Sequence, residues 1–207
     1  MHVVTSIDSK RTTTATRRRQ SPRASMRAAI YFDLASPYTY LAAERAERLF
    51  PGLRWLPAYS EALGCAGRVD DHERGLVAQR AAVLGLPIVW PMGPAARVVG
   101  AMRVATLAAE SHRCAEFVLA ASRLMFCGGF DIDEPEILAE AAGVAGIELG
   151  EMLHAAGDAG RDDEVEDAGR KLVEAGADRL PVLTVERRMF CGEDRLSEAA
   201  AAARAAG

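Results

Sequence analysis

A buried strand that runs straight into a capped helix is the feature that most limits how this chain can fold. Residues 27–34 (RAAIYFDL) are apolar and rich in β-branched and aromatic side chains, which is typical of a strand inside a sheet. Ser36 is a favourable N-cap, and Pro37 suits the first helical position because its missing N–H would have no partner there. The helical spacing continues until residues 50–52 (FPG) end it.

Strand signals return directly after this helix and again near the end of the chain. Residues 53–59 (LRWLPAY) predict a second strand, and a helical crossover places two such strands parallel in one sheet. Residues 181–185 (PVLTV) and 188–191 (RMFC) predict two short strands around a tight turn at Glu186-Arg187. An alanine-rich helix is expected over residues 194–206.

The middle of the chain shows only helical periodicity. Apolar residues recur every three or four positions over residues 75–84, 98–110, 113–126, 135–142, 149–156 and 163–175. Asp133 with Glu136 forms a plausible capping pair for the fourth of these helices. The element order predicts an α/β fold, a thioredoxin-like core (residues 26–60 and 177–207) with an all-helical domain (residues 61–176) inserted after the second strand.

The first 25 residues differ in composition from the rest. They hold six basic residues against one acidic residue and no apolar periodicity, which predicts a disordered basic tail over residues 1–25. No apolar segment follows Arg17-Arg18-Arg19, so secretion is disfavoured, and Met26 would serve equally well as a start. The net charge is −4 with a tail of +5, which leaves −9 on the body and makes nucleic acid a poor partner.

Several other classes of protein are disfavoured. The longest uncharged stretch, residues 81–96, is too short for a membrane span and contains three prolines. The four cysteines form no C-x-x-C pair and no cluster with histidine, so neither a metal site nor a dithiol redox centre is expected. With half of its residues hydrophobic, the chain can bury a core without disulfides, and reduced thiols indicate a cytoplasmic protein.

Ser36 is the first candidate for chemistry. A hydroxyl at the first turn of a helix lies at the positive end of the helix dipole, where N–H groups stabilise a nearby anion such as a thiolate. Ser36 could donate a hydrogen bond to that anion. The alternative is that Ser36 only caps the helix.

Three segments together resemble one family. Residues 32–41 (FDLASPYTYL), Trp90-Pro91 followed by residues 101–103 (AMR), and residues 189–196 (MFCGEDRL) occur in the order of the motifs of the 2-hydroxychromene-2-carboxylate isomerases. That family is related to kappa-class glutathione transferases within the DsbA-like thioredoxin superfamily. Redox members of the superfamily begin this helix with C-P-x-C, and here Ser36 and Thr39 replace both sulfurs. Dithiol exchange at this site is therefore not expected.

The resemblance implies a set of site residues for glutathione or another low-molecular-weight thiol. Ser36, beside Pro37, would hydrogen-bond the sulfur and hold it as the thiolate. Leu180, Pro181 and Val182 match the superfamily's cis-proline loop, which pairs with the peptide part of glutathione. Gly192, Glu193 and Asp194 match the stretch that holds the γ-glutamyl end. The resemblance also implies a homodimer.

Several positions depart from the family's pattern. Arg97 replaces an asparagine, Arg179 replaces a glycine before the cis-proline, and Cys191 replaces a tryptophan. Glu186-Arg187 replaces an Asp-Gly turn, and residues 64–68 (GCAGR) replace a Gly-Asn-x-Pro-Pro loop. Because these positions shape the acceptor side in relatives, we expect a different substrate, or reduced or lost activity.

Three functions follow from the resemblance. The first is a thiol-dependent isomerase of aromatic or conjugated small molecules, in which a bound thiolate adds reversibly to the substrate. The second is a kappa-like glutathione transferase. The third is a catalytically inactive thioredoxin-like module that binds a thiol or peptide, as the departures would allow.

Overall fold

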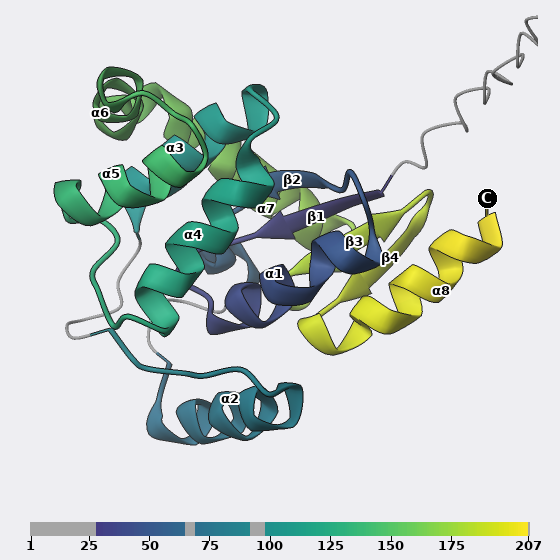
Figure 1. The fold of residues 1–207 in the computed structure, drawn as a ribbon. Helices are drawn as coiled ribbons and strands as arrows, with labels where there is room; N and C mark the ends of the chain where they lie inside the picture. Colours follow the sequence, from purple (N-terminus) through teal and green to yellow (C-terminus); the bar gives the residue numbers. More distant parts are fainter. Residues whose placement is uncertain (1–27, 65–68, 92–97, 207) are drawn as a thin grey trace, which may run out of the picture.

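The computed structural model describes residues 28–64, 69–91 and 98–206, so the predicted tail and Arg97 lie outside the described residues. Four strands form one sheet in the order β2-β1-β3-β4 (Figure 1). They are β1 (Ala28–Phe32), β2 (Arg54–Pro57), β3 (Val182–Val185) and β4 (Arg188–Cys191). β1 runs parallel to β2 and antiparallel to β3, and β4 closes an antiparallel hairpin with β3.

One face of the sheet carries the main hydrophobic core. The strand register aligns Trp55, Ile30, Leu183 and Phe190 across all four strands, and each of them is buried. Helices α1 (Pro37–Leu49) and α8 (Leu196–Ala206) pack against this face through their alanines and large apolar residues. Alternation along the strands therefore directs one set of side chains into this core.

The opposite face carries a smaller cluster. Tyr31, Val182 and Cys191 are aligned across β1, β3 and β4, and they pack with Leu172 of helix α7 (Asp162–Glu174). A Cβ at Gly169 would lie 2.8 Å from the carbonyl oxygen of Tyr59, so a glycine is required for the close approach of α7 to the segment that follows β2.

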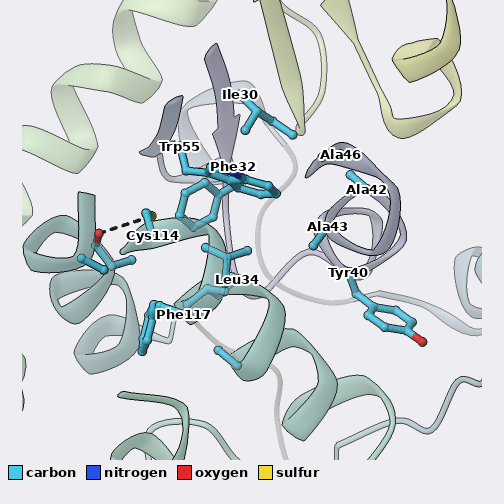
Figure 2. Packing of buried hydrophobic residues seen from close by; sticks show 14 of the residues in the cluster. Ile30, Phe32, Leu34, Tyr40, Ala42, Ala43, Ala46, Trp55, Cys114 and Phe117 are labelled. Atoms are coloured by element: carbon cyan, nitrogen blue, oxygen red, sulfur yellow. Dashed lines mark hydrogen bonds between the residues drawn. The ribbon is translucent and has the colours of Figure 1, made fainter. Parts of the chain in front are cut away.

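Further helices lie between β2 and β3 in sequence. They are η1 (Ser60–Leu63), α2 (Asp71–Leu84), α3 (Val99–Glu110), α4 (Cys114–Phe126), α5 (Pro135–Val144), α6 (Leu149–Gly157) and η2 (Ala159–Arg161). Helices α3 and α4 extend the main core beyond β2, where Phe32 meets Trp55 edge to face at 5.7 Å between ring centroids. Figure 2 shows Leu34 and Phe117 in the same cluster. Helix α2 lies apart at the bottom of Figure 1 and buries only Val77 and Ala81.

Two local predictions are wrong. Helix α2 begins at Asp71, four residues before the predicted start, because the side chain of Asp70 caps it by accepting from the N–H of Glu73 at 2.7 Å. Asp133 does not cap α5 with Glu136. It accepts instead from the N–H of Ala101 at 2.8 Å, at the start of α3.

The chain ends with a short turn before its last helix. The predicted helix over residues 194–206 is divided into a 3-10 turn, η3 (Glu193–Arg195), and α8. The predicted α/β fold, a thioredoxin-like core with helices between its second and third strands, is confirmed by the strand order and pairing. Among the described residues, no helix combines the length and the apolar character that crossing a membrane requires.

Candidate functional site

A cavity of about 840 Å³ opens beside the junction of β1 and α1. Three parts of the chain line it: the turn into α1, the cis-proline loop with the β4–η3 turn, and residues of η1 and α2 with Gly64 and Val69 beside them. The lining residues are Ala35, Ser36, Pro37, Tyr38, Ser60, Gly64, Val69, Glu73, Leu76, Arg80, Arg179, Leu180, Gly192, Glu193 and Asp194. Of the predicted site residues, Ser36, Pro37, Leu180, Gly192, Glu193 and Asp194 therefore meet at one cavity.

Ser36 occupies the N-cap position of α1, as predicted, and is half-buried. Its backbone N–H donates to the carbonyl oxygen of Asp33 at 3.1 Å. Its side chain makes no capping hydrogen bond to the helix. The hydroxyl is therefore not used for capping and is available to a group in the cavity.

Asp33 fixes the turn that presents Ser36. Its buried carboxylate accepts from the N–H of Ala35 at 2.9 Å, and from the N–H and hydroxyl of Ser60 at 3.0 and 2.7 Å. These bonds join the end of β1 to the start of η1 and hold two walls of the cavity together. Sequence reasoning missed this role, because the two residues are 27 positions apart.

The loop before β3 has the predicted conformation. The peptide bond between Leu180 and Pro181 is cis, and the carbonyl oxygen of Pro181 accepts from the N–H of Gly192 at 2.8 Å. Leu180 lines the cavity, whereas Pro181 and Val182 are buried and lie outside its lining. This hydrogen bond ties the cis-proline loop to the β4–η3 turn.

Glu193 is the most enclosed charged group of the site, with its side chain only 4% exposed. Its carboxylate accepts from Arg45 of α1 at 2.7 Å and from Arg80 of α2 at 2.5 Å. The hydrogen bond to Glu193 raises the pKa of the Arg80 guanidinium. Two guanidiniums thus compensate one buried carboxylate, and the pair of bonds links α2 to the core.

Asp194 is more exposed and weakly paired. Its Oδ1 lies 3.5 Å from Nη2 of Arg179, and the two side chains are 55% and 49% exposed. Both line the cavity at the cis-proline loop. Among the positions that depart from the family's motifs, Arg179 is thus brought into the cavity, whereas Glu186 and Arg187 lie at the β3–β4 turn and Cys191 on β4.

Tyr38 and Glu73 are cavity residues that sequence reasoning missed. Burial raises the pKa of the Tyr38 phenol, and the negative charges of Glu73 and Glu193 raise it further. Burial, and then the charge of Asp70, raises the pKa of Glu73. Tyr38 therefore remains a protonated hydrogen-bond donor at neutral pH.

A local signal for the α2 residues was present in the sequence. Asp70 followed three positions later by Glu73 has the spacing of a helix N-cap. From that start, Glu73, Leu76 and Arg80 recur at helical spacing and face one side of α2, which is the side that lines the cavity. No group of histidine, cysteine, aspartate or glutamate suited to a metal ion occurs in the parts of the chain that the structure describes.

Comparison with known proteins supports the fold described above. A model of the DSBA-like thioredoxin domain matches residues 70–203, which is well over half of the chain. The matched range contains the cis-proline loop and residues 192–194, while Ser36 precedes it. A comparison with curated proteins finds no match.

Solved structures show the same fold at low sequence identity. A 2-hydroxychromene-2-carboxylate isomerase is 17% identical with a TM-score of 0.69, over 86% of this chain and 95% of the other. A probable DsbA oxidoreductase from Streptomyces coelicolor is 22% identical with a TM-score of 0.66, over 87% of this chain and 90% of the other. The domain match and the shared fold lead to one conclusion: the chain belongs to the DSBA-like thioredoxin domain family.

Proposed function

We propose that this protein is a thiol-dependent isomerase of aromatic or conjugated small molecules, with glutathione or a similar thiol as its cofactor. The observation that supports this most directly is the Ser36 side chain, which makes no capping bond and lines a cavity at the N-terminus of α1. Redox catalysis by the usual dithiol is not available at this position, because Ser36 and Thr39 stand where two cysteines are needed.

The cavity suits a small peptide thiol in size and in its polar groups. A volume of about 840 Å³ is within the usual range for sites that hold a small molecule. The lining offers hydroxyl donors at Ser36 and Tyr38 and charged groups at Arg179 and Asp194. A tripeptide thiol with carboxylate and ammonium groups would find a guanidinium for one carboxylate and a carboxylate for its ammonium.

The chain's own residues would act on the sulfur and on the substrate. The Ser36 hydroxyl would donate to the sulfur, and the α1 N-terminus would favour its ionised form. A bound thiolate supplies a nucleophile that adds to an electron-poor carbon of a conjugated substrate and is later eliminated unchanged. The Tyr38 phenol, which stays protonated, would donate to the substrate oxygen on which negative charge develops.

A turnover assay separates this function from its alternatives. Conversion of 2-hydroxychromene-2-carboxylate is followed by ultraviolet absorbance with and without glutathione, for the wild type and a Ser36→Ala variant. We expect glutathione-dependent conversion that consumes no glutathione and that falls at least about a hundredfold in the variant. Far-ultraviolet circular dichroism checks that the variant is folded.

The other outcomes identify the alternatives. Consumption of glutathione in step with an aryl halide or quinone would indicate a kappa-like transferase. Unchanged glutathione binding without turnover of the chromene, a quinone or an aryl halide would indicate an inactive binding module. Turnover that needs no thiol would contradict the proposal.

A further inference from the structure

Arg179 lies directly over the backbone of Gly192. A Cβ built on Gly192 would be 2.6 Å from Nε and 3.1 Å from Nη2 of Arg179, and it would also clash with Oδ1 of Asp194. Gly192 has a φ of +94°, so both its conformation and its neighbours require glycine. The Arg179 guanidinium is therefore positioned between the cis-proline loop and the β4–η3 turn, at the wall of the cavity.

The two arginines of the cavity lining differ in how closely they are bound to carboxylates. Arg80 is bound to the buried carboxylate of Glu193 at 2.5 Å. Arg179 faces Asp194 and Asp178 at 3.5 Å each, which is longer than an ordinary N–H···O hydrogen bond. A guanidinium has five N–H donors, so Arg179 retains strong donor capacity for a ligand.

The charges of this wall do not by themselves favour an anion. Arg45 and Arg80 together carry one positive charge more than the Glu193 that they bind. Arg179 lies between Asp194 and Asp178, so two carboxylates share its one positive charge. Glu73 is a further acidic group of the lining. The wall therefore carries no positive excess, and a ligand carboxylate would be held by the N–H donors that Arg179 keeps beside its two long ion pairs.

We propose that Arg179 determines the ligand specificity of this cavity. It receives a carboxylate of the ligand, and it selects thiols whose end beside the cis-proline loop carries an anion rather than an ammonium group. This inference rests on the proposed function, because it assumes that the cavity holds a thiol. Arg179 also competes for Asp194 with any ligand ammonium, so a cationic end gains less there than it would beside an unpaired carboxylate.

Matched ligands test the proposal by calorimetry on the full chain. N-(2-mercaptopropionyl)glycine and its glycinamide carry the same thiol and differ only in the carboxylate. We expect the wild type to bind the acid at least about tenfold more tightly than the amide. In Arg179→Gln this preference should fall to within about twofold, and Arg179→Lys should restore part of it, because lysine keeps the charge without the bidentate geometry.

Arg204→Gln is the control variant, because it removes the same charge from the exposed side of α8, outside the cavity lining. It should keep the wild-type preference. A preference that survives in Arg179→Gln, or a wild type that binds acid and amide equally, would overturn the inference.

N-propionylglycine, which has the carboxylate but no sulfur, separates this inference from the proposed function. If it binds through Arg179 while no thiol is ionised, the proposed function fails and the carboxylate site stands. If thiols are ionised in a Ser36-dependent way without any preference for the acid, the inference about Arg179 fails alone.

Discussion

The hydroxyl of Thr39 lies in the core, within the first turn of α1. Its side chain is fully buried, and its Oγ1 has no hydrogen-bond partner among the described residues. Thr106 is buried equally well in α3, yet its hydroxyl donates to the carbonyl oxygen of Arg103 at 2.6 Å and accepts from Arg161 at 3.0 Å. The same substitution at the two positions should therefore change the free energy of unfolding in opposite directions.

We expect Thr39→Val to raise the free energy of unfolding by about 1 kcal/mol, because it removes a buried group without a partner. Thr106→Val should lower it by roughly 1–2 kcal/mol, because its partners lose their hydrogen bonds. Urea unfolding of both variants measures the difference. A loss of stability in both variants would show that the Thr39 hydroxyl is satisfied.

Glu73 gives a pH dependence at the residue scale. Burial raises its pKa in the folded state, so its stabilising contribution is present at low pH and is lost as the pH rises through the folded pKa. Glu73→Gln should therefore stabilise the protein at pH 7, by less than about 1 kcal/mol because the side chain is partly exposed. The gain should vanish near about pH 4, where the unfolded group is also protonated.

Thermal unfolding of Glu73→Gln across this pH range measures the effect. Glu140→Gln, on the exposed side of α5, is the matched control, and subtracting its profile removes the effect of one lost charge. If Glu73→Gln stabilised the protein as much at pH 4 as at pH 7, the effect could not come from the raised pKa of Glu73.

At the scale of elements, a buried ion pair anchors α2 to the core. It buries only Val77 and Ala81, and its Arg80 binds the enclosed carboxylate of Glu193. Glu193→Ala should destabilise the protein by roughly 3 kcal/mol, because it leaves two guanidiniums without their carboxylate. Amide hydrogen exchange over residues 71–84 should accelerate more than exchange in α1 or α4.

The ion pair between Arg123 of α4 and Glu44 of α1 is the control for this prediction. Arg123 is 54% exposed, so Arg123→Gln should cost at most about 1 kcal/mol and leave exchange in α2 unchanged. Equal acceleration of exchange in every helix of Glu193→Ala would mean that Glu193 supports the core as a whole and does not specifically anchor α2.

The elements that could be predicted from sequence are those whose signals are local. Ser36 and Pro37 begin α1 as predicted, because cap and first-turn preferences depend on a few adjacent residues. Asp133 was misassigned because it caps α3, 32 positions away, and no local pattern records that choice. The bond between Arg80 and Glu193 spans 113 positions and could not be derived from periodicity.

At the scale of the whole molecule, the cavity forms only when distant parts of the chain come together. The turn after β1 supplies Ser36, the cis-proline loop supplies Leu180 and Arg179, and α2 closes the third side with Glu73. The sheet positions the first two parts, because β1 pairs directly with β3. Solved structures of the same fold at 17% and 22% identity indicate that this framework tolerates wide changes in sequence.

The measurement that tests the central claim most directly is the pKa of a bound thiol. Glutathione is titrated with pH in the presence of the wild type or Ser36→Ala, and the thiolate is followed by its ultraviolet absorbance. We predict that the wild type lowers the pKa of the bound thiol by about one unit or more and that Ser36→Ala abolishes most of this shift. An equal shift with both proteins, or no shift with either, would contradict the role of Ser36 in activating a thiol.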